Sequence, residues 1–275
     1  MLVRIAGCAC VAALLLAGSS AARVDQAGVR AKQTVHALTV LGPRVAGSVN
    51  ELRAAHVVRF RFARLGLTPV VQRVPLPRGG FSRNLVFRTG GGPLRAIVVA
   101  HLDGVSAGPA ANDNGSGVGS LVEVARELGK TPGVLYAALG AEEQFMTRSS
   151  LHLGSARLLR SLTAAERRSV QVALSLDMVG YGPELNVRGL ETRPNRSARA
   201  ALAAARRIGV RATYLRDRGL SDHEELTAGG VPAAWIEWRW DPCWHSACDH
   251  VGRLDTAKLS AAIRLTVSAV RTATR

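Results

Sequence analysis

The sequence predicts an α/β fold, in which helices alternate with the strands of an open and mainly parallel sheet. Three short apolar runs have the length and composition of buried strands and end abruptly in polar residues: 97–100, 134–139 and 170–176. Between the first two runs, residues 118–128 place apolar side chains at helical spacing, which predicts a helix packed on a sheet by one face. The 275 residues suit one large domain, since no linker or low-complexity segment divides them.

Local patterns along the chain predict the remaining elements. Helical spacing recurs at 27–41, 48–65, 156–168, 195–208 and 259–270. Strand-like runs lie at 70–74, 84–88 and 232–238. Ser48 and Glu51 have the spacing of a capping box, and Thr163 with Glu166 suggests that the helical segment around them is two short helices. We expect the first helices to cover the sheet and the first strands to form its edge.

Polar side chains stand where the three apolar runs end. His101 and Asp103 follow the first run, Glu142 and Glu143 follow the second, and Asp177 follows the third. Because the carboxyl ends of parallel strands line one crevice in an open α/β sheet, these side chains should meet there. Their carboxylates would repel one another without a cation. Carboxylate and imidazole ligands suit zinc, manganese or iron, so the sequence predicts a metal site.

A loop rich in Asn, Ser and Gly, residues 112–117, precedes the helix predicted at 118–128. These residue types favour turns and helix N-caps. The loop would therefore hold Asp113 between the end of a strand and the start of a helix, beside the predicted metal site.

The first 22 residues have the pattern of an export signal. A short basic start (1–4) is followed by an apolar stretch (5–18) and by small residues suited to cleavage (19–22). The apolar stretch of about 14 residues falls short of the roughly 20 that span a bilayer. Cys8 has almost no apolar segment ahead of it, which disfavours a lipoprotein anchor. We expect an exported domain, residues 23–275, in the extracellular space, cell envelope or periplasm, without stable membrane insertion.

Removal of that signal leaves Cys243 and Cys248, five positions apart. In an exported protein such a pair suggests one small disulfide loop, which is worth roughly 2 kcal/mol by chain entropy. His245 lies inside this loop, and Asp249 follows it. A ligating histidine is usually oriented by a nearby carboxylate, so the pattern favours His245 as a metal ligand.

The formal net charge of +16 would permit binding to nucleic acid, anionic lipid or an acidic polymer. The arginines are scattered, however, and the chain has no basic helix, no finger motif and few aromatic residues to stack on bases. We therefore predict a solvated basic surface and no nucleic-acid partner.

Together these motifs resemble those of the zinc aminopeptidases of metallopeptidase family 28, and the likeness covers nearly all of the chain after the signal. The matching motifs, in chain order, are Arg44-x-x-Gly47-Ser48, His101-x-Asp103, Ala111-Asn112-Asp113-Asn114-Gly115-Ser116-Gly117, Ala141-Glu142-Glu143, Asp177-Met178-x-Gly180, Ser221-Asp222-His223 and His245-Ser246-x-x-Asp249. The resemblance implies a three-layer α/β/α fold with a central mixed, mostly parallel sheet, as in zinc peptidases of the phosphorylase/hydrolase-like fold. It also implies a peptide substrate, and a monomer is favoured.

The resemblance further implies two zinc ions bridged by Asp113 and a water molecule. His101 and Asp177 would complete the ligands of one ion, and Glu143 and His245 those of the other. Taken singly, each of these residues has an ordinary explanation, such as a helix cap for Asp113 or a hydrogen-bonded core histidine for His101. All five positions would have to be ordinary at once, which favours the metal site.

The resemblance implies that Glu142 is the general base and that Asp103 orients His101. A carboxylate next to a metal ligand can take a proton from water and pass it to the leaving amine. The consecutive glutamates at 142 and 143 suit such a division of roles.

Two departures from the family pattern concern the substrate pocket. Trp244 stands where a tyrosine commonly precedes the last histidine, and the indole N–H lies in a different place from the phenolic hydroxyl. Loss of an oxyanion donor costs on the order of 10² to 10³ in turnover, so we expect a slower enzyme or a changed substrate. Arg148 replaces a small residue and is expected to reshape the pocket wall, with His223 nearby. Four tryptophans are candidates for a hydrophobic pocket: Trp235, Trp238, Trp240 and Trp244, with core packing as the alternative for the first two.

The sequence therefore predicts an exported aminopeptidase that removes N-terminal residues from peptides. Carboxypeptidase or dipeptidase activity is an alternative on the same fold. Glutaminyl cyclases of this fold use one zinc ion and lack the full ligand set, so His101 and Asp177 argue against that reading. A catalytically weak peptide-binding protein is a further alternative. Trp244 favours this alternative, whereas the presence of Glu142 argues against it.

Overall fold

The computed structural model describes residues 26–143 and 152–275. One eight-stranded sheet runs through it in the order β1-β2-β4-β3-β5-β8-β6-β7. The strands are β1 (Val70–Pro75), β2 (Phe81–Arg88), β3 (Ala96–His101), β4 (Val134–Leu139), β5 (Val172–Leu176), β6 (Glu184–Gly189), β7 (Thr213–Arg216) and β8 (Ala234–Arg239). Four neighbouring strands in the middle, β4, β3, β5 and β8, are mutually parallel, while β2 and β6 run antiparallel to them. The sheet is mixed and the predicted strands are confirmed.

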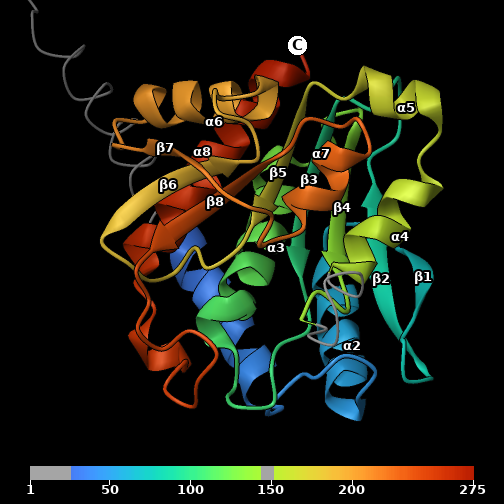
Figure 1. Cartoon of the computed structure of the whole chain (residues 1–275), viewed down its shortest axis with the longest axis vertical. Coiled ribbons are helices and arrows are strands. Elements are labelled where there is room, and N and C mark those ends of the chain that lie inside the picture. The colour runs from blue at the N-terminus through green and yellow to red at the C-terminus, as the bar shows by residue number, and fades with distance from the viewer. Residues whose placement is uncertain (1–25, 144–151) are drawn as a thin grey trace, which may run out of the picture.

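Helices cover both faces of the sheet and complete three layers (Figure 1). The helices are 26–39, α2 (Val49–Ala63), α3 (Gly117–Leu128), α4 (Leu153–Ser161), α5 (Ala164–Ser169), α6 (Arg196–Arg207), α7 (His223–Ala228) and α8 (Thr256–Ala273). The larger core joins the helix at 26–39, α2, α3, α6 and α8 to one face of the sheet, and a second core joins α4 and α7 to the other face. The three-layer α/β/α prediction is therefore confirmed.

The alternation of the central strands explains this division. In β3, the side chains of Ala96, Val98 and Ala100 belong to the larger core, whereas those of Ile97 and Val99 belong to the second. Successive side chains of a strand point to opposite faces, so a strand buried on both faces must be apolar throughout. This requirement produced the continuous apolar runs from which the strands were predicted.

The two predicted caps have different outcomes. Thr163 and Glu166 form a complete capping box, with Thr163 Oγ1 accepting from the N–H of Glu166 and Glu166 accepting from that of Thr163. This cap separates α5 from α4, as predicted. At α2, Ser48 accepts from the N–H of Glu51, but the Glu51 carboxylate accepts from Gly47 N–H at 2.7 Å and from the hydroxyl of Ser82. Glu51 is thus directed into the molecule.

Three short elements were not predicted: β6, β7 and α7. The β6 sequence mixes Glu184, Asn186 and Arg188 with apolar residues, and β7 is only four residues long and partly exposed. In the described parts of the chain, no helix is both long enough and apolar enough to cross a membrane. The export signal predicted at 1–22 lies outside the described residues.

Candidate metal centre

Parallel strands carry the predicted ligands to one edge of the sheet. His101 is the last residue of β3, Glu142 and Glu143 follow β4 after a two-residue step, and Asp177 follows β5 directly. Asp113 lies in the kinked segment Ala111–Ser116, where its backbone is not helical (φ −108°, ψ 90°), directly before α3. The predicted gathering of these acids at the carboxyl ends of the strands is what the topology produces.

Asp113 lies between two histidines. Its Oδ1 is 3.2 Å from Nε2 of His101, and its Oδ2 is 3.2 Å from Nε2 of His245. Each imidazole also meets a second carboxylate: Nε2 of His101 is 3.4 Å from Oδ1 of Asp177, and Nε2 of His245 is 3.0 Å from Oε2 of Glu143. The five predicted ligands thus form two groups that share Asp113.

The donor atoms of this cluster are better arranged to bind a metal ion than to form hydrogen bonds with one another. Within the described residues, neither ring nitrogen of His101 has a partner with hydrogen-bond geometry, and Oδ1 of Asp177 also has none, although all three atoms are buried. Buried polar atoms without partners are costly. Potential donor atoms of His101, Asp113 and Glu143 lie within 4.8 Å of one another, as do those of His101, Glu142 and Asp177. Imidazole nitrogen and carboxylate oxygen together are ligands that zinc accepts.

Burial and mutual repulsion shift the ionisation of the cluster. Burial, followed by the charge of Asp113, raises the pKa of Glu143 well above its usual value, and burial raises the pKa of Glu142 to about 7. Burial alone would lower the pKa of His101, but Glu142, Asp177 and Asp113 outweigh it and raise that pKa. Without a metal, these carboxylates are therefore partly neutralised by protons. Bound metal cations would neutralise them instead.

Asp103 supports the glutamate pair. It is fully buried, and its two carboxylate oxygens accept the backbone N–H groups of Glu142 at 3.1 Å and Glu143 at 3.0 Å. Its Oδ1 is 3.8 Å from Nδ1 of His101, longer than a hydrogen bond. The hydrogen bonds of Asp103 thus fix the turn that carries Glu142 and Glu143. The family resemblance implied a different role for Asp103, which was to orient His101.

Asp249 supports the shared carboxylate. Its Oδ1 accepts from the N–H of Asn112 at 2.7 Å, and its Oδ2 accepts from the N–H of Asp113 at 3.0 Å. The sequence suggested that Asp249 orients the ring of His245, which lies four positions earlier in the chain. The structure places it beneath Asp113, which is 136 positions away.

Arg44 supports the loop between β3 and Asp113. Its guanidinium is completely buried and donates to the carbonyl oxygens of Leu102, Pro109 and Ala110 at 2.7 to 2.9 Å. Burial lowers the pKa of Arg44 to about 10, which leaves the group charged at neutral pH. The motif containing Arg44 was recognised in the sequence, but its carbonyl partners could not be predicted from it.

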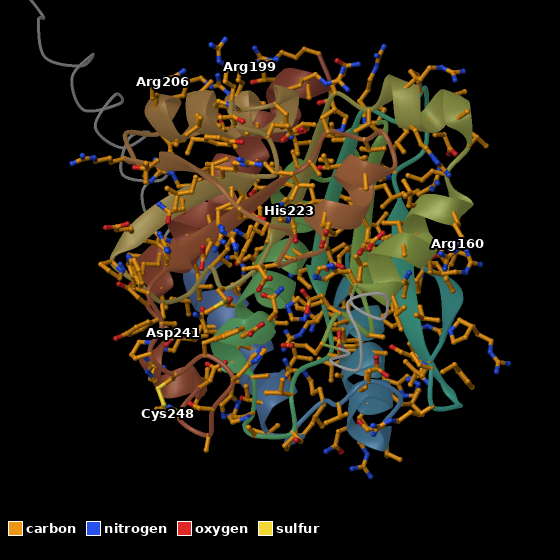
Figure 2. The ribbon with its side chains drawn as sticks, viewed as in Figure 1. Arg160, Arg199, Arg206, His223, Asp241 and Cys248 are labelled. Carbon is orange, nitrogen blue, oxygen red and sulfur yellow. A yellow bond between two sulfur atoms is a disulfide. The ribbon has the colours of Figure 1, made fainter. Side chains whose placement is uncertain are left out.

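His245 lies on a loop closed by the predicted disulfide between Cys243 and Cys248. Figure 2 shows Cys248 at the periphery of the molecule, on the same side as Asp241. The indole of Trp244 stacks on the imidazole of His245, with 4.0 Å between ring centroids, and 56% of Trp244 is exposed. Trp244 therefore contacts the candidate ligand His245 with its ring face and also lines the cavity beside it.

A cavity of about 440 Å³ opens beside the ligands. Trp235, Trp240 and Trp244 line it, together with residues that the sequence did not suggest, including His152, Arg188 and Glu237. No sequence motif marked these three.

One tryptophan and one histidine from the predicted pocket lie outside the cavity lining, and for Trp238 this is the core packing that the sequence left open. Trp238 does not line the cavity; its indole donates to the carbonyl oxygen of Lys258. His223 is fully buried outside the cavity lining, with Nε2 3.0 Å from Oδ2 of Asp217. As the first residue of α7 it faces the core. Arg148, the other predicted pocket residue, lies outside the described residues.

Comparison with known proteins gives the same assignment as the motifs. The chain is 31% identical over 191 residues to aminopeptidase YwaD of Bacillus subtilis, covering 65% of this chain and 41% of that protein. It is 32% identical over 176 residues to the probable lipoprotein aminopeptidase LpqL of Mycobacterium tuberculosis, covering 56% of this chain and 34% of that protein. The chain thus spans less than half the length of these two relatives.

Solved structures share the fold at low sequence identity. The zinc aminopeptidase BSAP of Bacillus subtilis superposes with a TM-score of 0.81 at 20% identity, covering 90% of this chain and 95% of that one. A glutaminyl cyclase of Bacteroides thetaiotaomicron superposes with a TM-score of 0.76 at 19% identity, covering 88% and 97%. At such identities the likeness concerns the fold alone. Residues 84–270, more than half of the chain, match Peptidase family M28, and this chain belongs to that family.

Proposed function

We propose that the protein is a zinc-dependent aminopeptidase that binds two zinc ions and removes N-terminal residues from peptides. The observation that carries the proposal is the position of Asp113, whose two carboxylate oxygens each lie 3.2 Å from a different histidine. Each of those histidines is also beside a second carboxylate, Asp177 or Glu143. Two three-residue ligand groups that share one carboxylate suit a pair of metal ions.

His101 and Asp177 would hold one zinc ion, Glu143 and His245 would hold the other, and Asp113 would bridge them. When bound, the two ions lower the pKa of a shared water molecule and polarise the scissile carbonyl group. The ring nitrogens of His101 and Oδ1 of Asp177, which are buried and lack hydrogen-bond geometry to any described residue, support this assignment.

Glu142 lines the cavity beside these ligands and is the residue we assign as general base. It would take a proton from the attacking water while the water oxygen bonds to the carbonyl carbon. As the carbon–nitrogen bond breaks, Glu142 would deliver that proton to the leaving amine. Asp103 would keep Glu142 in place through the backbone N–H at 3.1 Å.

The amino-terminal specificity is supported by the relatives, which are named as aminopeptidases. We also propose that residues 1–22 direct export. N-terminal sequencing of the protein recovered outside the cytoplasm would test this, with a new terminus at residue 23 as the expected result.

Activity on aminoacyl p-nitroanilides tests the proposed reaction. We expect hydrolysis that a chelator abolishes and zinc restores, about two equivalents of bound zinc, and a loss of about 10³-fold or more in kcat for Glu142→Gln with zinc retained. N-acetylated substrates should be inert if a free amine is required.

The same assay includes the competing functions. C-terminally blocked and free peptides detect carboxypeptidase or dipeptidase activity, and ammonia release from an N-terminal glutaminyl peptide detects cyclase activity. A folded protein that binds two zinc ions but hydrolyses none of these substrates would contradict the proposal and favour a peptide-binding role. Zinc binding at one equivalent or less would contradict the paired site.

A further inference from the structure

His152 is a buried histidine in the cavity wall that none of the assignments above uses. Its Nε2 lies 3.3 Å from Oε1 of Glu142, and its Nδ1 lies 3.3 Å from Oε2 of Glu224 on α7, an ion-pair contact that lacks hydrogen-bond geometry. Its side chain is only 4% exposed. One imidazole thus joins the proposed general base to a carboxylate on a different helix.

The backbone of His152 is held in an unusual conformation. Its φ of 51° and ψ of 37° place it in the left-handed region, which is uncommon for a residue with a side chain. Such conformations persist where surrounding contacts impose them, and they concentrate at functional sites. Here the N–H of His152 donates to the carbonyl of Glu142 at 3.3 Å, and the N–H of Leu153 donates to that of Ala141 at 3.0 Å.

Close packing fixes the start of α4 against the end of β4. A Cβ atom on Gly154 would lie 2.3 Å from the carbonyl oxygen of Gly140, so only glycine permits this approach. The carbonyl of His152 accepts from the Ser155 hydroxyl at 3.0 Å. The ring of His152 is therefore carried by a turn that is tied to the backbone of Glu142 itself.

We propose that His152 is a positioning residue that holds Oε1 of Glu142, so that the other carboxylate oxygen is directed toward the reacting water. The ion-pair contact of Glu224 with Nδ1 acts on the same ring from its other side. The inference rests on the proposed function, in which Glu142 is the general base. A carboxylate held by a donor at one oxygen loses rotational freedom, and a general base acts only when its free oxygen is within reach of the water.

Two substitutions of His152 separate positioning from packing. His152→Gln keeps an N–H donor near the place of Nε2, whereas His152→Leu fills similar space without one. We expect His152→Leu to lower kcat about 10-fold or more, with KM and the bound zinc unchanged, and His152→Gln to recover most of that loss. Glu224→Gln should lower kcat less, and its effect should disappear when combined with His152→Leu, because both act through one imidazole. Glu184→Gln, at the exposed start of β6, is the control with no expected change.

The outcomes distinguish this inference from the proposed function. An inactive wild type, or a Glu142→Gln variant as active as wild type, would overturn the role of Glu142 and that of His152 with it. If Glu142→Gln is inactive but His152→Leu keeps the wild-type kcat, or if His152→Gln loses as much as His152→Leu, the positioning role is wrong while the function stands. If His152→Leu does not fold, Glu224→Gln decides, and an unchanged kcat there overturns the inference.

Discussion

Asp249 would bind no metal itself, yet both of its carboxylate oxygens hold the backbone of the segment that carries Asp113. Groups that orient metal ligands typically contribute 10- to 100-fold to metal affinity. Burial raises the pKa of Asp249 to about 6, and its two backbone hydrogen bonds limit that rise. The residue is therefore ionised at neutral pH and able to accept both N–H groups.

We expect Asp249→Asn to weaken zinc binding by about 10- to 100-fold, because an amide presents one N–H₂ group to a backbone N–H. Competition with a chelator of known affinity would measure the change. Asp255→Asn is the control, since Asp255 caps α8 and accepts from the N–H of Ala257 away from the ligands. Equal zinc affinity in the two variants would show that Asp249 does not support the centre.

At the scale of elements, the loop between β3 and the Asp113 segment depends on one buried side chain. Arg44 donates to three carbonyl oxygens of this loop and comes from the segment before α2. Loops carry function when a rigid scaffold positions them. Here the guanidinium of Arg44 holds the loop in place through its three hydrogen bonds.

Replacing Arg44 by methionine should lower the free energy of unfolding by about 3 kcal/mol or more, because buried carbonyl groups lose their donors. Urea denaturation of the zinc-loaded protein would measure this. Arg53→Met, an exposed position on α2, should change stability by less than about 0.5 kcal/mol. A loss for Arg44→Met no greater than that of Arg53→Met would contradict the assignment.

The disulfide loop is the other element that holds a ligand. Cys243 and Cys248 enclose His245, whose φ of 54° lies in the left-handed region. We expect the double variant Cys243→Ser, Cys248→Ser to lose about 2 kcal/mol of stability. We also expect it to release the proposed zinc ion held by His245 at a lower chelator concentration than wild type. Thermal unfolding and zinc titration would check both effects. Zinc release at the same chelator concentration as wild type would indicate that the loop does not need the bridge.

For the whole molecule, the pH dependence of unfolding should include one residue outside the metal centre. Glu51 is fully buried beneath the end of β4, and burial raises its pKa from 4.5 to about 7. The folded protein therefore binds a proton that the unfolded chain releases, and the contribution of this group to stability falls as the pH rises from about 4.5 to about 7.

The variant Glu51→Gln lacks this titration. From pH 5 to pH 8 its free energy of unfolding should gain about 2 kcal/mol relative to wild type at equal zinc loading. Chemical denaturation at both pH values would measure the difference. Glu184→Gln, an exposed position at the start of β6, serves as control. A constant difference between wild type and Glu51→Gln would place the pKa of Glu51 near its ordinary value.

Much of the architecture could be predicted because the central strands are buried on both faces and so read as apolar runs. β6 and β7 were missed because they mix charged and apolar residues at the less covered end of the sheet. Arg160, Arg199 and Arg206 are exposed at the periphery of the molecule (Figure 2), as a solvated basic surface requires.

The candidate ligands could be predicted from short motifs, but their supports could not. Asp249 and Asp103 act through backbone N–H groups 39 to 137 positions away, which leaves no local pattern. His152 reaches Glu142 through a left-handed turn that its residue type disfavours. Long-range hydrogen bonds and unusual backbone angles are set by tertiary packing, so they appear only with the fold.

The position of Asp113 between His101 and His245 also determines when the site can form during protein synthesis. The two imidazoles belong to segments 144 positions apart, and Asp249, which steadies the shared carboxylate, is made later still. A growing polypeptide on the ribosome therefore lacks part of the cluster until residue 249 has been synthesised. Binding of the proposed zinc ions would follow that step, and the ions would come from the compartment in which the chain folds.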